Sequence, residues 1–218
     1  NNNHVDVIVI GEGVFAFREI VEQYYQKKEA TIDNLQNIKG IAIPGPGELY
    51  FTPQRIYPDI DSLPFPARNL TLKNRGKYFN TWMKPLSMMR TSIGCQFRCN
   101  FCLQWKMSGG KYLPRDPGLV VEELASIGEP YVSFADDETL LDAKRMMTLA
   151  DSIGKAGIKK KYRFFARADT IVRHPELIDA WKEVGLTSIL VGFEAYKDED
   201  LKLLNKKYSF LSCSFFLR

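Results

Sequence analysis

The stretch YVSFADDETLLDAKRMMTLADSIGKAGIKKKYRFFARAD, residues 131–169, decides the fold. It begins with a predicted strand at 131–138, continues with apolar residues at helical spacing over 142–157, and returns to a predicted strand at 162–169. A strand, a helix and a strand in this order form a unit whose two strands lie parallel in one sheet. The stretch therefore predicts an α/β protein with a parallel sheet.

The same alternation continues on both sides of this stretch. Asp116 as N-cap and Pro117 at the first helical position mark the start of one further helix. Four strand–helix repeats from residue 88 onward indicate a partial barrel of the TIM type that lacks one or more β/α units. The remaining predicted elements of this region are strands at 88–94 and 188–195 and helices at 117–128, 175–185 and 198–206.

Polar side chains follow each predicted strand of this region. In parallel α/β folds, ligands bind where the strands end at their carboxyl edge. The candidates for a functional site are therefore the polar residues at or just after the carboxyl ends of the four strands, in turn Cys95, Cys99 and Cys102; Asp136, Asp137 and Glu138; Arg167; and Glu194.

The three cysteines have the spacing Cys-x3-Cys-x2-Cys, with no fourth cysteine nearby. A structural zinc site takes four protein ligands, and the chain's two histidines, His4 and His174, lie far away in the sequence, which disfavours zinc. Three thiolates on one loop suit a [4Fe–4S] cluster with one iron left open for a ligand from outside the protein. Buried structural cysteines are the alternative, and the polar residues between the cysteines disfavour it.

The composition is that of a globular protein, with 45% hydrophobic and 26% charged residues. The longest apolar runs are too short to span a bilayer, and the first residues lack the pattern of a signal peptide, so we predict a cytoplasmic protein with no transmembrane segment. The net charge of +4 is slight, and we interpret the lysines at 159–161 as a solvated helix end. No nucleic-acid partner is expected.

The N-terminal part predicts a separate, incomplete unit. A β-branched run at 5–11 predicts a buried parallel strand, which a turn at Gly11-Glu12-Gly13 joins to a helix at 15–28. A short strand at 38–43 and a hairpin or loop at 44–53 follow. Because one strand and one helix do not complete a doubly wound domain, we expect a fragment that is cut at both ends.

The motif Cys95-x3-Cys99-x-Phe101-Cys102, placed after the first strand of a β/α series, resembles the signature of the radical S-adenosylmethionine (SAM) superfamily. The resemblance implies that the open iron of a [4Fe–4S] cluster chelates the amino and carboxylate groups of SAM. It also implies that one electron from the cluster cleaves SAM to a 5′-deoxyadenosyl radical, while the protein holds and aims these cofactors. The three cysteines would then be the catalytic residues and the metal ligands.

The same resemblance implies which side chains contact SAM. The acids at 136–138 stand where family members bind the SAM amino group, and charge-assisted hydrogen bonds are strong. Arg167 would pair with the SAM carboxylate, and Glu194 matches an acid at the end of the family's fourth strand. The implied cofactor-binding set is Phe101, Asp136, Asp137, Glu138, Arg167 and Glu194.

Other interpretations of these residues stay open. For the three acids, the alternative is that they cap a helix that begins near Leu140. For Arg167, the alternative is an ordinary surface residue. For Glu194, the alternative is a buried acid paired with Arg167. Relatives often have Glu-Ser-Gly where this chain has Glu194-Ala195-Tyr196, which weakens any transfer of ribose contacts.

The proline-rich segment at 52–70 includes Asp59-Ile60-Asp61-Ser62-Leu63-Pro64-Phe65-Pro66. It is similar to the D-x-D-x-L-P-x-P linker that joins a cobalamin-binding domain to the radical SAM domain in one branch of the superfamily. Gly11, Glu12 and Gly13 would then form a cobalamin-contacting loop, since glycines permit close backbone approach; a turn that only joins strand and helix is the alternative. We expect the C-terminal end of a Rossmann-like cobalamin-binding domain at 1–51, a linker at 52–87, the first part of the radical SAM domain at 88–208 and an atypical tail at 209–218 that indicates truncation.

Within this branch, the sequence resembles the hopanoid C-3 methylase type over nearly all of residues 5–208. That resemblance implies methylation of an unactivated carbon with methyl transfer from cobalamin. It also implies a small-molecule substrate such as a hopanoid or another lipid, an electron donor such as flavodoxin or ferredoxin, and peripheral membrane association if the substrate is a lipid. The alternatives are a cobalamin-associated cyclase or rearrangement enzyme, a non-catalytic iron–sulfur protein and an inactive truncated product.

Overall fold

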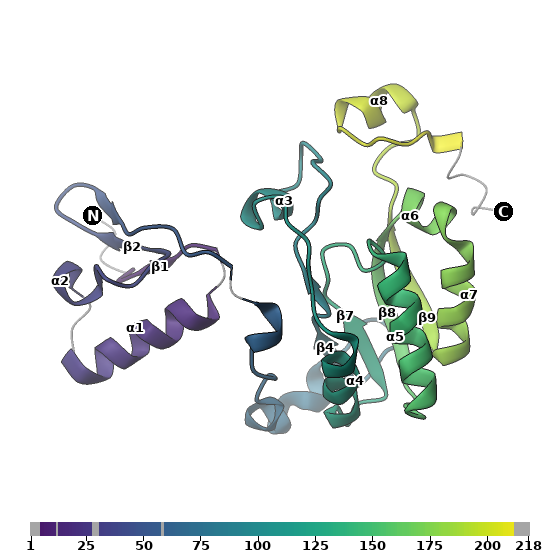
Figure 1. The fold of residues 1–218 in the computed structure, drawn as a ribbon, viewed down its shortest axis with the longest axis horizontal. Coiled ribbons are helices and arrows are strands. Elements are labelled where there is room, and N and C mark those ends of the chain that lie inside the picture. The colour runs from purple at the N-terminus through teal and green to yellow at the C-terminus, as the bar shows by residue number, and fades with distance from the viewer. Residues whose placement is uncertain (1–4, 12, 28–30, 58, 212–218) are drawn as a thin grey trace. The chain divides into compact units, whose positions relative to one another are not determined.

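The chain divides into two compact units, residues 1–63 and residues 64–218, and each is described by itself. The computed structural model describes residues 5–11, 13–27, 31–57 and 59–211 (Figure 1). Among the helices described, none combines the length and the apolar character needed to cross a membrane.

The first unit holds helices packed against a small antiparallel sheet of order β1-β2-β3. Its core consists of Ala16, Leu35, Ile38, Ile41 and Ile43. The turn between β2 and β3 is closed by a hydrogen bond from the Gly45 amide to the Glu48 carbonyl. Of the two predictions for 44–53, a hairpin or a loop, the structure shows the hairpin, whose first strand begins earlier, at Ile41. The elements are β1 (Ile8–Val9), α1 (Val14–Lys27), α2 (Ile32–Leu35), β2 (Ile41–Pro44) and β3 (Leu49–Phe51).

The prediction of a buried parallel strand at 5–11 is wrong. β1 runs antiparallel to β2, and Ile8 is 40% exposed. Val7 and Val9 pack against the core whereas Ile8 and Ile10 face outward, so only one side of this run is covered. A continuous apolar run does not by itself distinguish a strand buried on both faces from a strand with one exposed face.

Two 3-10 helices follow the first unit's sheet in the proline-rich part of the chain, η1 (Ile60–Ser62) and η2 (Arg68–Lys77). Asp59 caps η1 by accepting a hydrogen bond from the Asp61 amide. η2 belongs to the second unit, where Arg68 forms an ion pair with Glu123 of α4 and Arg75 forms one with Glu129 of the loop between α4 and β7. This part of the chain is therefore held by side-chain ion pairs and short helices.

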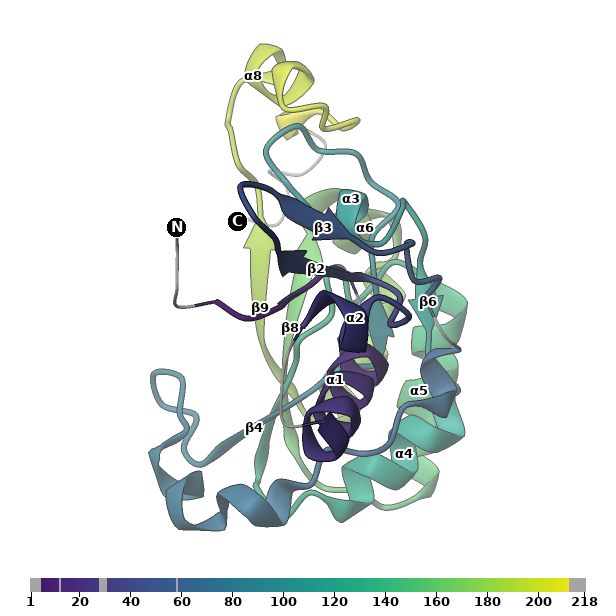
Figure 2. The same cartoon turned by 90° about the vertical axis from the view of Figure 1, so that its left-hand side faces the viewer.

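The second unit contains a parallel four-stranded sheet of order β4-β7-β8-β9. Each strand lies beside the preceding parallel strand of the chain, and α4, α5 and α7 cover one face of the sheet (Figures 1 and 2). This arrangement is that of a partial barrel and confirms the predicted α/β class. Its main elements are β4 (Leu86–Met89), α4 (Pro117–Ser126), β7 (Tyr131–Phe134), α5 (Ala143–Lys155), β8 (Lys161–Arg167), α7 (Pro175–Val184) and β9 (Leu186–Gly192).

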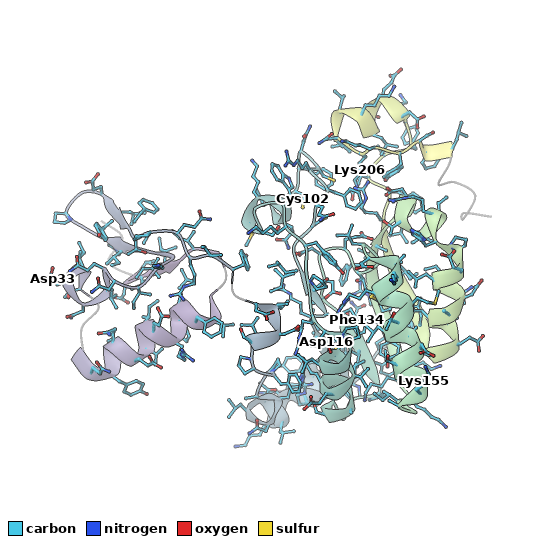
Figure 3. The ribbon with its side chains drawn as sticks, in the orientation of Figure 1. Asp33, Cys102, Asp116, Phe134, Lys155 and Lys206 are labelled. Carbon is cyan, nitrogen blue, oxygen red and sulfur yellow. The ribbon has the colours of Figure 1, made fainter. Side chains whose placement is uncertain are left out.

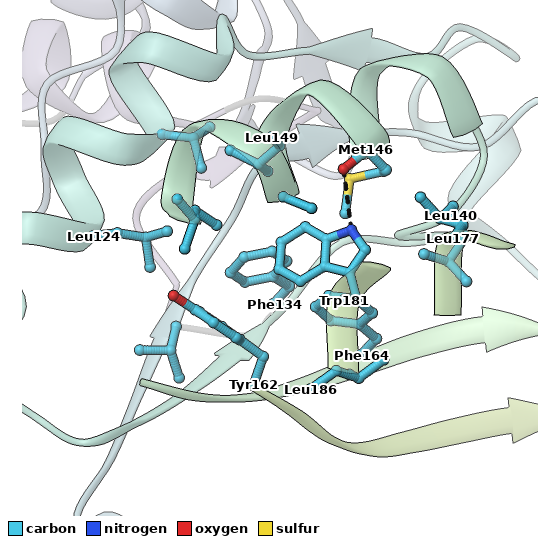
Figure 4. Close-up of a cluster of buried hydrophobic side chains, with 14 of the residues drawn as sticks. Leu124, Phe134, Leu140, Met146, Leu149, Tyr162, Phe164, Leu177, Trp181 and Leu186 are labelled. Atoms are coloured by element: carbon cyan, nitrogen blue, oxygen red, sulfur yellow. Dashed lines mark hydrogen bonds between the residues drawn. The ribbon is translucent and has the colours of Figure 1, made fainter. Parts of the chain in front are cut away.

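Aromatic side chains fill the space between the sheet and the helices (Figure 4). Trp181 lies at the centre, with Phe164 and Phe134 at ring-centroid distances of 4.7 and 5.7 Å, and its Nε1 donates to the Met146 carbonyl at 3.0 Å. Tyr162 and Phe164 alternate with residues that face the other side of β8. Phe165 and Arg167 therefore lie on the opposite face of the sheet, which no described helix covers.

The remaining short elements lie toward the end of the second unit where the parallel strands finish (Figures 1 and 2). The predicted strand at 88–94 is broken: β4 ends at Met89, and Ser92–Ile93 pairs antiparallel with Leu113–Pro114 in a separate sheet. The short elements are β5 (Ser92–Ile93), α3 (Gln104–Met107), β6 (Leu113–Pro114), α6 (Ala168–Arg173) and α8 (Asp198–Leu203).

The interpretation of residues 159–161 as a helix end is wrong, although Lys159 and Lys161 are exposed to solvent. α5 ends at Lys155, and the Lys160 ammonium donates to the carbonyls of Ile127 and Glu129. These bonds fasten the loop before β8 to the turn before β7, so this lysine has a structural role.

Candidate functional site

The three cysteines of the loop after β5 line a single pocket of about 200 Å³ in the second unit. Cys102 and Lys206, which both line it, are labelled at the same end of the unit in Figure 3. The ends of β8 and β9 and the loop after β7 supply the other walls. Of the predicted residues of this region, the lining contains Cys95, Cys99, Phe101, Cys102, Asp137, Glu138, Arg167 and Glu194.

Asp136 fixes the chain where it enters the cysteine loop. Its Oδ1 accepts from the amides of Thr91 and Ser92 at 2.6 and 3.0 Å, and its Oδ2 accepts from the Thr91 hydroxyl at 2.5 Å. Arg145 also restrains Thr91, because its Nη2 donates to the Thr91 carbonyl at 2.8 Å. These bonds use the backbone groups that would have continued β4, which explains why the strand ends early.

The next turn of the loop depends on Gly94 and Asp137. Gly94 has a φ of +86°, and a Cβ at this position would collide with the Lys111 carbonyl oxygen, so only glycine fits. The Gly94 amide donates to Asp137 Oδ2 at 2.7 Å, while Gln104 Nε2 donates to Oδ1 at 2.7 Å. Asp137 therefore ties the two ends of the cysteine loop together.

The predicted acidic triplet is divided by the structure. Asp136 is buried, has both oxygens engaged and does not line the pocket, whereas Asp137 and Glu138 do. The alternative that these acids cap a helix is wrong, because α5 begins at Ala143 and Asp142 caps it by accepting from the Arg145 amide.

Glu138 has the most unusual environment of the site. Its side chain is 2% exposed, Oε2 accepts from the Arg167 amide at 2.8 Å, and Oε1 has no hydrogen-bond partner of normal geometry among the described residues. Burial raises the pKa of this carboxyl to about 7, although the Arg167 amide and charge and the nearby Thr170 hydroxyl lower it. A buried carboxylate oxygen that lines a pocket without a partner is suited to a cationic ligand.

Arg167 organises the side of the pocket at Cys99. Its Nη1 donates to Cys99 Sγ at 3.4 Å, its Nε pairs with Asp169 at 2.9 Å, and the guanidinium lies 3.7 Å from the Phe97 ring centroid. The arginine is buried, so the alternative that it is a surface residue is wrong.

Burial raises the pKa of the Cys95 thiol to about 11, so this thiol is protonated at neutral pH in the metal-free chain.

Glu194 and Lys206 form the opposite wall. Glu194 has a φ of +66°, an uncommon conformation for a residue other than glycine, and its Oε1 lies 3.4 Å from Lys206 Nζ. The alternative that Glu194 is paired with Arg167 is therefore wrong. Lys206 is 5% exposed and lies 5.6 Å from the Phe101 ring centroid. Sequence reasoning missed it because a Lys-Lys pair after a short helix is typical of a solvated surface.

No group of three or more Cys, His, Asp or Glu side chains within the described ranges converges closely enough to hold a single metal ion. The three thiols nevertheless share one pocket. Each thiolate of a [4Fe–4S] cluster binds a different iron, so the thiols need not meet at one point. A donor set made only of cysteines fits such a cluster.

The glycine turn of the first unit is described only in part, because Glu12 lies outside the described residues. Gly11 has a φ of +83°, and the Gly13 carbonyl accepts a hydrogen bond from the Phe17 amide in the first turn of α1. A Cβ at Gly11 would meet no atom within 4 Å, so its freedom is needed for backbone conformation rather than for space.

Comparisons with known proteins agree with this geometry. Residues 89–211 match the model of the radical SAM superfamily. The chain is 29% identical over 205 residues to the hopanoid C-3 methylase of Methylococcus capsulatus, covering 94% of this chain and 38% of that protein. It is 27% identical over 210 residues to the anaerobic magnesium-protoporphyrin IX monomethyl ester cyclase of Cereibacter sphaeroides, covering 93% and 34%.

A solved structure has the same fold. It is that of the cobalamin-dependent SAM radical enzyme OxsB with aqua-cobalamin and SAM bound, with a TM-score of 0.78 at 22% identity over 97% of this chain and 31% of that chain. The chain thus spans well under half the length of these relatives. Because the family model covers more than half of the chain and includes every residue that lines the pocket, the chain belongs to the radical SAM superfamily.

Proposed function

We propose that this chain carries the cluster-binding and SAM-binding part of a cobalamin-dependent radical SAM enzyme. The observation that carries the proposal is the joint placement of three thiols and the buried, incompletely paired carboxylate of Glu138 on one pocket. Thiols suit iron, and an orphan carboxylate oxygen suits an ammonium group.

The residues have distinct roles in this proposal. Cys95, Cys99 and Cys102 hold a [4Fe–4S] cluster, which when bound supplies the electron that cleaves SAM to methionine and a 5′-deoxyadenosyl radical. Glu138 Oε1 accepts the SAM ammonium. Arg167 donates to the SAM carboxylate through Nη2, since Nε donates to Asp169 and Nη1 donates to Cys99.

The remaining lining residues orient the cofactor. Asp137 keeps the loop closed through its bonds to Gly94 and Gln104, and Phe101 offers an apolar face beside the third cysteine. Glu194 is held by Lys206 at the end of β9, where its carboxylate faces the pocket. Asp136 acts by positioning the loop and makes no contact with SAM in this scheme.

The reaction that we favour is methylation of an unactivated carbon of a small molecule. The similarity to the hopanoid methylase supports a lipid-like substrate, and the fold of the cobalamin-dependent enzyme supports a cobalamin partner at the Gly11-Glu12-Gly13 turn. The same proposal includes an electron donor such as flavodoxin or ferredoxin and a cytoplasmic location. It also divides the chain into the end of a cobalamin-binding domain at 1–51, a linker at 52–87 and the first part of the radical SAM domain at 88–208.

A second candidate function is cyclisation. Its support is the similarity to magnesium-protoporphyrin IX monomethyl ester cyclases, which extends over 93% of this chain. The two reactions differ in what happens to SAM: methyl transfer consumes a methyl group and releases S-adenosylhomocysteine, and cyclisation does not.

The test is anaerobic reconstitution of the full chain with iron and sulfide. We expect about four irons per chain, lost when any of Cys95, Cys99 or Cys102 is replaced by Ala. Stoichiometric zinc without a brown chromophore would contradict the proposal. With SAM and reductant, 5′-deoxyadenosine distinguishes a radical enzyme from an electron-transfer protein, and S-adenosylhomocysteine distinguishes methylation from cyclisation.

A further inference from the structure

The middle of the cysteine loop is fastened by a segment about a hundred residues later in the chain, residues 203–206. Asn100 donates through its backbone amide to the Leu204 carbonyl at 3.2 Å and through Nδ2 to the Leu203 carbonyl at 2.6 Å. In the other direction, Asn205 Nδ2 donates to the Arg98 carbonyl at 2.5 Å. These three bonds bracket Cys99.

The backbone of this segment explains why its polar groups point at the loop. α8 ends at Leu203, and Asn205, two residues later, has a φ of +56°. The Asn205 amide donates to the Lys202 carbonyl and the Lys206 amide donates to the Leu201 carbonyl, which closes the turn after the helix. Asparagine is one of the few residues besides glycine that favour this left-handed conformation at a helix end. The same residue therefore stops the helix and supplies the donor to the loop.

The segment is itself fixed to the sheet. Tyr208 donates its hydroxyl hydrogen to the backbone carbonyls of Gly192 and Phe193, at 3.2 and 2.9 Å, where β9 ends. Lys206 reaches into the pocket, where it pairs with Glu194. The cysteine loop is thereby connected through residues 203–206 to a rigid strand.

We propose that residues 203–206 are a positioning device for the cysteine loop, which keeps Cys99 and Cys102 at the pocket and Cys99 protected from solvent. Cys99 is 6% exposed although it lies on an irregular loop, which fits such a restraint. The consequence for cluster retention rests on the proposed function, whereas the consequence for thiol accessibility does not.

The test compares Asn205→Gly, Asn205→Asp and Asn100→Ala with the wild-type full chain. Gly and Asp both tolerate the left-handed backbone at 205 but remove the donor to the loop. In the iron-free chain, we expect iodoacetamide to alkylate Cys99 about fivefold faster in each single variant, since one hydrogen bond contributes about a factor of five to the equilibrium for opening the loop. In the double variant Asn100→Ala/Asn205→Gly, which lacks two of these bonds, we expect alkylation to be about 25-fold faster. Site-resolved mass spectrometry measures the rates. Asn74→Ala, at an exposed position of η2, is the matched control and should not change them.

A second measurement separates local opening from general destabilisation. Hydrogen exchange should accelerate at residues 96–102 and leave α4, α5 and α7 unchanged. In the reconstituted chain, iron release to a chelator should accelerate by similar factors. Unchanged Cys99 alkylation in the double variant would overturn the proposal, and so would faster exchange spread evenly over the unit. If wild-type chain binds no iron, the proposed function fails while the alkylation result still decides this inference.

Discussion

Replacing Glu138 with Gln should remove a large part of the pH dependence of the second unit's stability. The pKa of this buried carboxyl is raised from 4.5 to about 7, so the folded state binds the proton more tightly than the unfolded state. The resulting stabilisation is present below pH 4.5 and is lost as the pH rises through about 7. Integrated from pH 5 to pH 8, the free energy of unfolding of the wild type should fall by about 2.5 kcal/mol through this group alone.

The assay is urea unfolding of the metal-free chain at a series of pH values. All three tryptophans, at positions 82, 105 and 181, belong to the second unit, so their fluorescence reports on that unit. The difference between wild type and Glu138→Gln isolates Glu138 from other titrating groups. Glu122→Gln, at an exposed position of α4, is the control. If the free energy of unfolding changes with pH in the same way in wild type and Glu138→Gln, Glu138 is not a buried carboxylate with an unsatisfied oxygen and a raised pKa.

Three further predictions concern positioning and packing. Asp136→Asn should lower the free energy of unfolding by about 1–3 kcal/mol in urea titrations, because an amide replaces an acceptor that faces the donors of Thr91; a value near zero would contradict the role of this acid in ending β4. Arg167→Lys should lower the cluster's reduction potential by on the order of 50 mV in redox titrations, because a hydrogen bond to Cys99 Sγ is weakened; an unchanged potential would argue that this bond is absent in the loaded protein. Trp181→Phe should lower the free energy of unfolding, followed by circular dichroism, by about 1–3 kcal/mol, since it removes the indole hydrogen bond to the Met146 carbonyl and opens a small cavity; an unchanged value would contradict the central place of Trp181 in the core.

The regular part of the second unit follows from its sequence pattern. The apolar periodicity of the helices and the short apolar strands predicted α4, α5 and α7 to within a few residues, since each element buries one face against the same core. Asp116 caps α4 as predicted, because an N-cap acts on its own helix and depends little on distant residues.

The carboxyl edge of the sheet was predictable in outline for a different reason. Parallel strands bring their ends to the same edge, so residues far apart in sequence were expected to meet there. Cys102, Glu138, Arg167 and Glu194 do share one pocket. Their individual partners could not be predicted, since they depend on side-chain contacts across that edge.

Contacts between distant segments account for what sequence reasoning missed. β4 stops at Met89 because a carboxylate some 45 residues later takes the backbone donors of Thr91 and Ser92. The burial of Lys206 depends on the way α8 ends, which no local pattern of apolar residues encodes. In the first unit, the edge position of β1 depends on which strands stand beside it.

The central claim is that three cysteines hold a cluster with one iron open to SAM, and the electron paramagnetic resonance spectrum of the reduced, reconstituted chain tests it most directly. We predict a [4Fe–4S] signal whose g values shift when SAM is added, and whose shift weakens in Glu138→Gln because the ammonium partner is lost. A spectrum that SAM leaves unchanged in the wild-type chain, or the absence of any iron–sulfur signal after reconstitution, would contradict the account.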